Sequence, residues 1–239
     1  MTMSGTVSQI LVPKFKEDCL LSKGIEVKDL LEIRKETVLY VKPCTSERGK
    51  LMADIELTKD PDSLFMDPKT LCSLLEIHRR RFAEMRCSEK LGVAKLRWGG
   101  REISIFKNGK LKIQQAIDRD EIMRIANSMS RLIWGSAICG VCGQPTINCA
   151  SGKCGKCASH EKVTVQLAGL PNSELLQQGY ASLENIDDST PEYSDIKLRK
   201  ARYLALHFVM DAPSKENAAL GLVLLGETDR VETRLKPKP

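Results

Sequence analysis

Aromatic side chains are scarce in this chain of 239 residues, because Phe, Trp and Tyr together make up 5% of it. This scarcity argues against a dedicated platform for single-stranded nucleic acid, which uses aromatic rings to stack bases. Long apolar runs are lacking too: Ala218–Leu225 is far shorter than the roughly 20 residues needed to span a membrane. The start, Met1–Val7, lacks the basic and then apolar pattern of an export signal, so a cytoplasmic protein with no membrane association is expected.

The chain also lacks the short motifs of the common enzyme classes. It contains no P-loop, no dinucleotide-binding glycine motif, no G-x-S-x-G and no H-E-x-x-H. Of its three histidines, His78 and His207 fall in apolar stretches and are expected to be satisfied core residues. Catalytic groups can meet in space without being neighbours in sequence, so an enzyme is not excluded. A non-catalytic protein with no evident small-molecule substrate is the favoured reading.

Composition indicates a globular chain, since 42% of the residues are hydrophobic and 28% are charged. The length allows one large domain or two small ones. Nine cysteines without an export signal indicate a reducing compartment. Four of them, Cys139, Cys142, Cys154 and Cys157, form two C-x-x-C pairs with eleven residues between the pairs.

This spacing predicts a metal site. A C-x-x-C pair brings two thiolates to one ion from a single tight turn, and four thiolates complete a tetrahedral zinc site. Such closed four-cysteine sites are usually structural. The residues between the pairs, Gly143–Lys153, are expected to form a short arm out and back, with turns at Gln144-Pro145 and Ser151-Gly152.

On these cysteines and Gly143, the segment Ile138–Ala158 resembles a zinc ribbon of the kind found in double-zinc-ribbon proteins. The resemblance implies bound zinc. Cys149 lies inside the arm as a possible alternative ligand, and five cysteines so close together also suit an iron–sulfur cluster. His160 is a further alternative ligand. Zinc is the expected cofactor, with an iron–sulfur cluster as the alternative.

The hydrophobic pattern before the cysteines predicts an α+β domain over residues 1–135. A β-meander with an Asn108-Gly109 turn leads into a helix capped by Asp118, with Glu121 at the capping-box position. The segment Arg101–Ile133 resembles one half of the TATA-binding-protein fold. The expected elements are strands over 37–43, 51–57, 93–98, 101–107 and 110–115, and helices from Asp67 to about Lys90 and from Asp118 to about Gly135.

After a metal-binding ribbon over 136–160, the remainder, 161–239, is expected to be mainly helical. An acidic linker is predicted over 185–194, where Asp-Asp-Ser-Thr-Pro interrupts the pattern. The expected elements are a strand over 163–167 and helices over 173–183, 195–210 and 214–225, the last ended by Gly226.

The net charge of +6 is unevenly distributed. Residues 79–112 hold eleven basic side chains against three acidic ones, whereas residues 163–196 hold six acids and no base. Strand alternation places Lys95, Arg97, Lys110 and Lys112 on one face of the meander, opposite apolar side chains. These observations favour a non-catalytic binding or assembly component that contacts a protein partner, or else nucleic acid, through this face. The alternative is an iron–sulfur protein in electron transfer or cluster handling.

Overall fold

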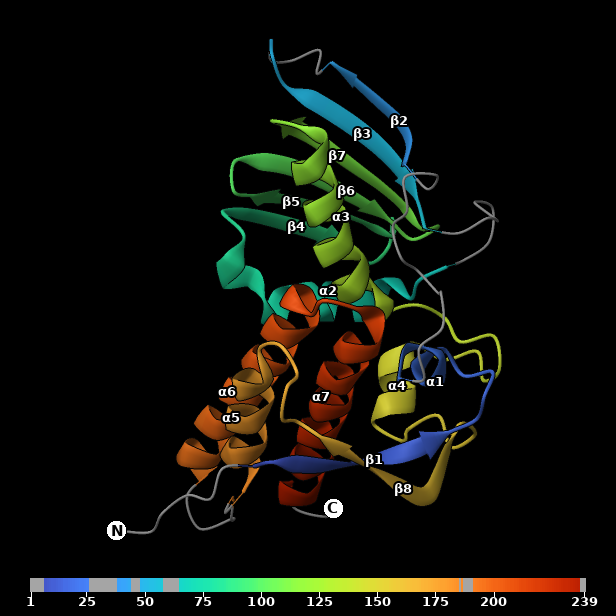
Figure 1. The fold of residues 1–239 in the computed structure, drawn as a ribbon, viewed down its shortest axis with the longest axis vertical. Helices are drawn as coiled ribbons and strands as arrows, with labels where there is room; N and C mark the ends of the chain where they lie inside the picture. The colour runs from blue at the N-terminus through green and yellow to red at the C-terminus, as the bar shows by residue number, and fades with distance from the viewer. Residues whose placement is uncertain are drawn as a thin grey trace. The chain divides into compact units, whose positions relative to one another are not determined.

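The computed structural model describes residues 7–25, 38–43, 48–57, 65–184, 186 and 191–236. These residues form a mixed α/β fold with two antiparallel sheets and seven α-helices (Figure 1). The chain divides into unit 1, Met1–Lys28 with Cys139–Pro239, and unit 2, Asp29–Ile138. The described N-terminal residues, 7–25, therefore group with the cysteine-rich and C-terminal segments. None of the described helices is long and apolar enough to cross a membrane.

Unit 2 contains a six-stranded antiparallel sheet in the order β2-β3-β7-β6-β5-β4. The predicted meander is confirmed, with Gly100 and Gly109 in left-handed conformations at its two turns. The strands are β2 (Val38–Pro43), β3 (Leu51–Glu56), β4 (Glu84–Ser88), β5 (Val93–Trp98), β6 (Arg101–Phe106) and β7 (Lys110–Ala116).

Helix α3 (Arg119–Trp134) packs against this sheet (Figure 1). It begins as predicted, because the Asp118 carboxylate accepts a hydrogen bond of 2.7 Å from the Glu121 N–H. One face of the helix is buried, including Ile122, Ile125 and Met129, and so are Ile103 and Ile113 on the sheet. The alternation of apolar and polar residues along each strand thus leaves the polar set for the other face of the sheet.

The predicted helix from Asp67 to about Lys90 is wrong in its second half. Helix α2 (Pro68–Ile77) is capped by Asp67 as expected, but Arg79–Arg81 form one turn of 3-10 helix and β4 follows. The segment forms a strand because pairing of β4 with β5 at the edge of the sheet supplies the backbone hydrogen bonds that a continued helix would have made. The likeness to the TATA-binding-protein fold is not confirmed.

In unit 1 the N-terminal strand pairs with a strand that follows the cysteines. Strand β1 (Gln9–Phe15) lies antiparallel to β8 (Ala158–Gln166), with Val12 opposite Val163. Ile10, Val12 and Phe15 are buried on one face of β1. The strand predicted over 163–167 is therefore the end of a longer strand, and the N-terminal residues are its partner.

Three helices form the C-terminal part of unit 1: α5 (Ser173–Leu183), α6 (Pro191–Asp211) and α7 (Lys215–Leu235). The predicted acidic linker is corrected, because residues 191–194 form the first turn of α6 and Ile186 is buried in a cluster with Leu198 and Val231. Residues 185 and 187–190 of that linker lie outside the described residues.

The expected helix end at Gly226 is also wrong, because α7 continues to Leu235. Gly226 does not cap the helix; it allows another backbone segment to pack closely against α7. A Cβ at Gly226 would lie 2.6 Å from backbone atoms of Ala150 and Ser151. Val231, five residues further on, is buried and gives the added turns an apolar contact.

Candidate metal centre

Six cysteines of unit 1 converge although they come from four separate segments. Two short helices help to place them: α1 (Leu20–Ile25) directly follows one cysteine, and α4 (Thr146–Ala150) carries another. Cys19 precedes α1, Cys139 and Cys142 precede α4, Cys149 lies on α4, and Cys154 and Cys157 lie between α4 and β8.

The segment between the two C-x-x-C pairs is organised around α4, where the sequence predicted an arm out and back. Pro145 begins this helix, which brings Cys149 inward and leaves it fully buried. Gly143, directly after the first pair, has φ +68° and donates its N–H to the Cys139 carbonyl over 2.7 Å. A zinc-ribbon fold is therefore not confirmed for this segment.

The six sulfurs form two groups of four, and within each group all sulfurs lie within 4.8 Å of one another. Cys149 and Cys157 belong to both groups. The Cys142 and Cys149 sulfurs are 3.5 Å apart. The first group is Cys19, Cys139, Cys149 and Cys157, and the second is Cys142, Cys149, Cys154 and Cys157.

The four ligands predicted from spacing are divided between these groups. Cys139 falls in the first, Cys142 and Cys154 fall in the second, and Cys157 is shared. Cys149, named from sequence as an alternative ligand, is shared as well. His160, the other alternative, is exposed and belongs to neither group.

Sequence reasoning missed Cys19, which lies 120 positions before Cys139. No local spacing could reveal it. The pairing of β1 with β8 carries it to the site, and the Lys16 N–H donates to the Cys157 carbonyl over 2.9 Å directly beside it. The local sequence gives little signal either, because residues 10–15 (ILVPKF) are mostly apolar and do not alternate with polar residues.

Water is largely excluded from the first group. Cys19, Cys139 and Cys149 have no exposed surface and Cys157 is 1% exposed, whereas Cys142 and Cys154 are half-buried. All six thiols are free of disulfide bonds in the structure. The donors that the two groups offer to an ion are therefore sulfurs alone, and those of the first group are shielded from water.

The sulfurs are electrostatically unequal. Hydrogen bonding from Cys149 lowers the pKa of the Cys19 thiol against the opposing effect of burial, and the backbone N–H groups of Leu21 and Ser22 lower it further. Burial raises the pKa of Cys154, but backbone N–H groups of Lys156 and Cys157 outweigh it and leave that pKa lowered.

Cys149 and Cys157 shift in the opposite direction. Donation to Cys19, followed by burial, raises the pKa of Cys149, and burial followed by the neighbouring Cys19 charge raises that of Cys157. The pKa of each shared sulfur is therefore raised while only thiols surround it. A soft cation between them would supply the missing positive charge.

Helix α7 packs against α4 and the loop that follows it. Gly226 allows its backbone to approach Ala150, the residue after Cys149. Lys153, in the loop after α4, forms an ion pair of 3.2 Å with Asp229 on α7. Both contacts fix α4 and the loop that bears Cys154 against a long, well-packed helix.

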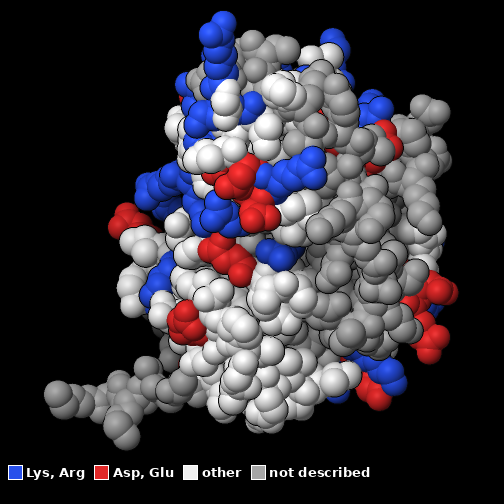
Figure 2. All heavy atoms as spheres, turned by 45° about the horizontal axis from the view of Figure 1, so that its top comes forward, with Lys and Arg blue, Asp and Glu red and all other residues white. Residues whose placement is uncertain are grey.

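The predicted basic face of unit 2 lies on one side of the sheet, but carboxylates are mixed into it. Arg97 forms ion pairs of 3.2 Å with both Glu84 and Glu102, and Lys110 pairs with Glu56 over 3.5 Å. On the surface of the molecule in view in Figure 2, which is not limited to this sheet face, Lys and Arg also lie among Asp and Glu. The face is therefore of mixed charge.

Two of the four predicted residues, Lys95 and Lys112, stand in a different row across the strands. Register places Arg86, Lys95, Ser104 and Lys112 side by side on β4, β5, β6 and β7. No carboxylate among the described residues forms an ion pair with Arg86, Lys95 or Lys112. The row ends at a carboxylate, because Asp54 on β3 lies opposite Lys112.

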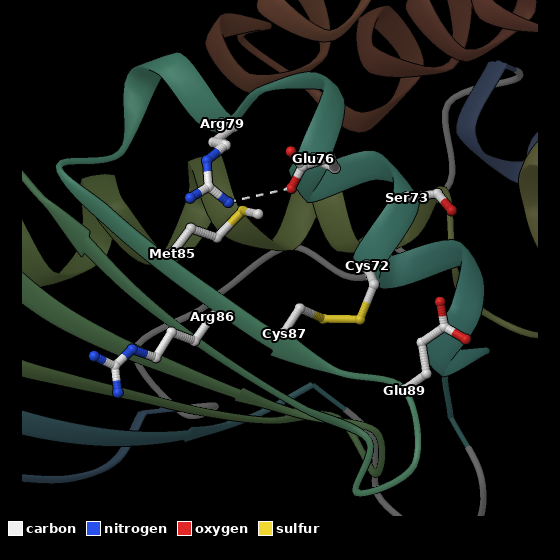
Figure 3. Close-up of a pocket in the computed structure, with 8 residues that line it drawn as sticks. All are labelled: Cys72, Ser73, Glu76, Arg79, Met85, Arg86, Cys87 and Glu89. Carbon is white, nitrogen blue, oxygen red and sulfur yellow. Dashed lines mark hydrogen bonds and ion pairs between the residues drawn. A yellow bond between two sulfur atoms is a disulfide. The ribbon is translucent and has the colours of Figure 1, made fainter.

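Unit 2 also contains a pocket of about 490 Å³ beside a disulfide bond that sequence analysis did not predict. The bond joins Cys72 on α2 to Cys87 on β4, with Glu76 and Arg79 paired over 3.4 Å nearby (Figure 3). His78 is fully buried, as predicted, and lies outside the lining. The pocket is lined by Cys72, Ser73, Glu76, Arg79, Met85, Arg86, Cys87 and Glu89.

His207, the last histidine, is half-buried on α6 and pairs with Asp211 one turn later over 2.9 Å. It pairs within its own helix but is not the core residue that its apolar stretch predicted, and neither cysteine group includes it. Comparison with known proteins adds no further candidate: no family model, no curated protein and no solved structure matches the chain.

Proposed function

We propose that the chain is a non-catalytic zinc protein that acts as a binding component. Its zinc centre in unit 1 is structural, and the mixed-charge sheet face of unit 2 contacts a partner. The observation that carries the zinc assignment is the convergence of six thiols in two groups with no histidine or carboxylate in either. Thiolate-only sites favour soft or borderline metals such as zinc over magnesium or calcium.

The donor set supports a structural role over a catalytic one. Catalytic zinc keeps one coordination position for water or substrate, and its ligands usually include histidine or a carboxylate. Here four sulfurs are available for each ion, and the first group is buried. An ion held by four thiolates has no position left for a reacting molecule.

The spacing of the sulfurs favours a single tetrahedral ion per group over an iron–sulfur cluster. A zinc–sulfur bond of about 2.3 Å places tetrahedral sulfurs about 3.8 Å apart, which is compatible with groups whose members all lie within 4.8 Å. An iron–sulfur cluster contains inorganic sulfide between its irons, and this spreads its cysteine ligands further apart. Iron–sulfur electron transfer remains the alternative function.

Elemental analysis of anaerobically purified protein tests this assignment. We expect zinc, no acid-labile sulfide and no visible colour. The Cys149→Ser variant should lose zinc, whereas a Cys72→Ser/Cys87→Ser control in unit 2 should keep it. Brown protein with iron and sulfide in matching amounts would make the electron-transfer alternative correct.

The composition of the sheet face favours a protein partner over nucleic acid. Glu84, Glu102 and Glu56 lie among the basic residues and would repel a continuous phosphate backbone. The three cations Arg86, Lys95 and Lys112 stand in a row that Asp54 of β3 ends, and a row this short suits a short acidic stretch on a folded or extended protein.

A matched pair of charge-reversal variants tests this face. Lys95→Glu/Lys112→Glu removes the row, and Lys162→Glu/Lys200→Glu makes the same charge change at exposed positions of unit 1. We expect only the first variant to lose proteins that the wild type captures from a native extract. Equal capture by all three would refute the face assignment, and oligonucleotide binding lost only in the first would identify nucleic acid as the partner.

A further inference from the structure

We infer that unit 1 holds a dinuclear zinc–thiolate cluster, in which Cys149 and Cys157 bridge two ions and Cys19 is a terminal ligand. This inference rests on the proposed zinc function and specifies its stoichiometry and ligands. It differs from the four-cysteine site that the C-x-x-C spacing predicts, because it uses six sulfurs and two ions.

The overlap of the two groups is the first argument. Each group has the size of one tetrahedral site, since its four sulfurs all lie within 4.8 Å of one another. Two separate four-coordinate ions need eight thiolates. Six thiolates suffice only if two of them bind both ions, and the structure has two sulfurs that belong to both groups, Cys149 and Cys157.

The division of the C-x-x-C pairs is the second argument. In a site with one ion, both cysteines of a pair bind the same metal. Here Cys139 is grouped with Cys19, whereas Cys142 is grouped with Cys154. A single ion in the first group would leave the half-buried Cys142 and Cys154 without a metal, and a single ion in the second would leave the buried Cys19 and Cys139 without one. Two ions give every one of the six sulfurs a role.

The hydrogen bonds around the sulfurs fit the same assignment. Backbone N–H groups of Leu21 and Ser22 reach Cys19, and those of Lys156 and Cys157 reach Cys154. Both acceptors are terminal ligands in the proposed cluster, where a thiolate keeps lone pairs and negative charge for such bonds. A bridging thiolate shares its charge between two metals and has less need of them.

The charge balance supports two ions as well. Two Zn²⁺ with six thiolates carry a net charge of −2, the same as one Zn²⁺ with four thiolates. The second ion therefore allows two more thiols to ionise without adding net negative charge to the buried group. Ionisation of all six releases protons on metal binding, which a weakly buffered titration would detect.

Metal stoichiometry of the full chain tests the cluster. We expect about two zinc ions per chain in the wild type, and about one in Cys19→Ser, which keeps the second group, and in Cys142→Ser, which keeps the first. Cys149→Ser and Cys157→Ser should each lose nearly all zinc because they remove a bridge. The Cys72→Ser/Cys87→Ser variant, altered in unit 2, should keep about two.

NMR of the cadmium-substituted wild type tests the cluster without any variant, so a variant that fails to fold cannot affect the result. Two cadmium resonances with scalar coupling between them would show that thiolates bridge the ions. One zinc per chain after reconstitution with excess metal, or a single cadmium resonance, would overturn the cluster and leave the proposed structural zinc site intact. Protein that binds no zinc would overturn both.

Discussion

Gly226 of helix α7 lies directly against Ala150, the residue that follows Cys149 on α4. A Cβ at position 226 would come within 2.6 Å of the Ala150 carbonyl carbon and oxygen, and both are backbone atoms that cannot rotate away. Through this contact, α7 fixes the position of α4 and so of Cys149, one of the two cysteines shared by both groups. It also explains why a glycine in mid-helix, normally unfavourable by about 1 kcal/mol, is used there.

Replacing Gly226 with Ala should therefore displace α4 and weaken the metal centre. We expect a loss of about 1–3 kcal/mol in the free energy of unfolding of unit 1, typical of overpacking, and faster transfer of zinc to a chromogenic chelator. Gly140→Ala is the matched control, because a Cβ there meets nothing within 4 Å. If both variants release zinc at the wild-type rate, the contact does not support the site.

The metal region illustrates what the sequence could and could not predict. The C-x-x-C pairs identified a thiolate site because their spacing is a local property. Cys19 could not be found, since its position depends on the pairing of β1 with β8, a contact between residues about 150 positions apart. Membership of Cys149 in both groups depends on α4, a five-residue helix too short to have a clear periodic signal.

In unit 2 the same distinction holds between local and tertiary signals. The meander and α3 were predictable because Asn108-Gly109 and Asp118 specify a turn and a helix start within a few residues. The segment after α2 was mistaken for helix because Phe82 and Met85 continue the helical spacing. Strand pairing with β5 overrides this local helical preference. No residue within the segment itself indicates that this pairing will form.

Metal removal should loosen β1 and β8 selectively. A two-stranded sheet is marginally stable by itself, and the cluster ties Cys19, four residues after β1, to Cys157, the residue before β8. We expect chelation to increase amide hydrogen exchange at Ile10 and Val12 by at least tenfold. Amides of Ile103 and Ile105 in unit 2 serve as the internal control and should be unaffected.

The outcome against this prediction is also clear. If the β1 amides keep their protection while zinc is fully removed, strand pairing alone holds the N-terminal segment and Cys19 is dispensable for it. If both units lose protection together, the protein unfolds as one cooperative system and the effect is not specific to β1.

The disulfide between Cys72 and Cys87 should stabilise unit 2. It closes a loop with a sequence separation of 15 and ties α2 to β4, the edge strand of the sheet. Constraint of the unfolded chain by such a loop contributes about 3 kcal/mol. We expect Cys72→Ser/Cys87→Ser, or reduction of the wild type, to lower the free energy of unfolding by about 2–4 kcal/mol in denaturant titrations.

Zinc content separates this effect from the metal centre. The double variant should keep its full zinc content, because the six cysteines of the centre lie in unit 1. An unfolding curve identical to that of the wild type under oxidising conditions would show that the disulfide contributes nothing to stability.

Acid should destabilise unit 2 through Glu121. Burial alone would raise the pKa of this carboxyl, but Arg101, which donates from Nε over 3.0 Å, and the Ile117 N–H, at 2.7 Å, outweigh burial and hold the pKa below its ordinary value of 4.5. Because the folded-state pKa is lowered, the stabilisation is present above the unfolded-state pKa and is lost as pH falls through the folded-state value. Both side chains are less than one-fifth exposed, at 16% and 13%, so solvent screens the pair only weakly.

Glu121→Gln should therefore lose about 1–3 kcal/mol of stability at neutral pH, since the buried Arg101 keeps its charge without a carboxylate. Its stability should then fall less steeply than that of the wild type below about pH 4.5, where the unfolded wild-type chain protonates Glu121 before the folded chain does. Glu102→Gln is the control: its partner Arg97 is 45% exposed, so this change should cost less than about 1 kcal/mol. Thermal unfolding, monitored by circular dichroism between neutral pH and about pH 3, measures both effects. Parallel pH profiles of stability for the wild type and Glu121→Gln would show that Glu121 is not the acid-sensitive group.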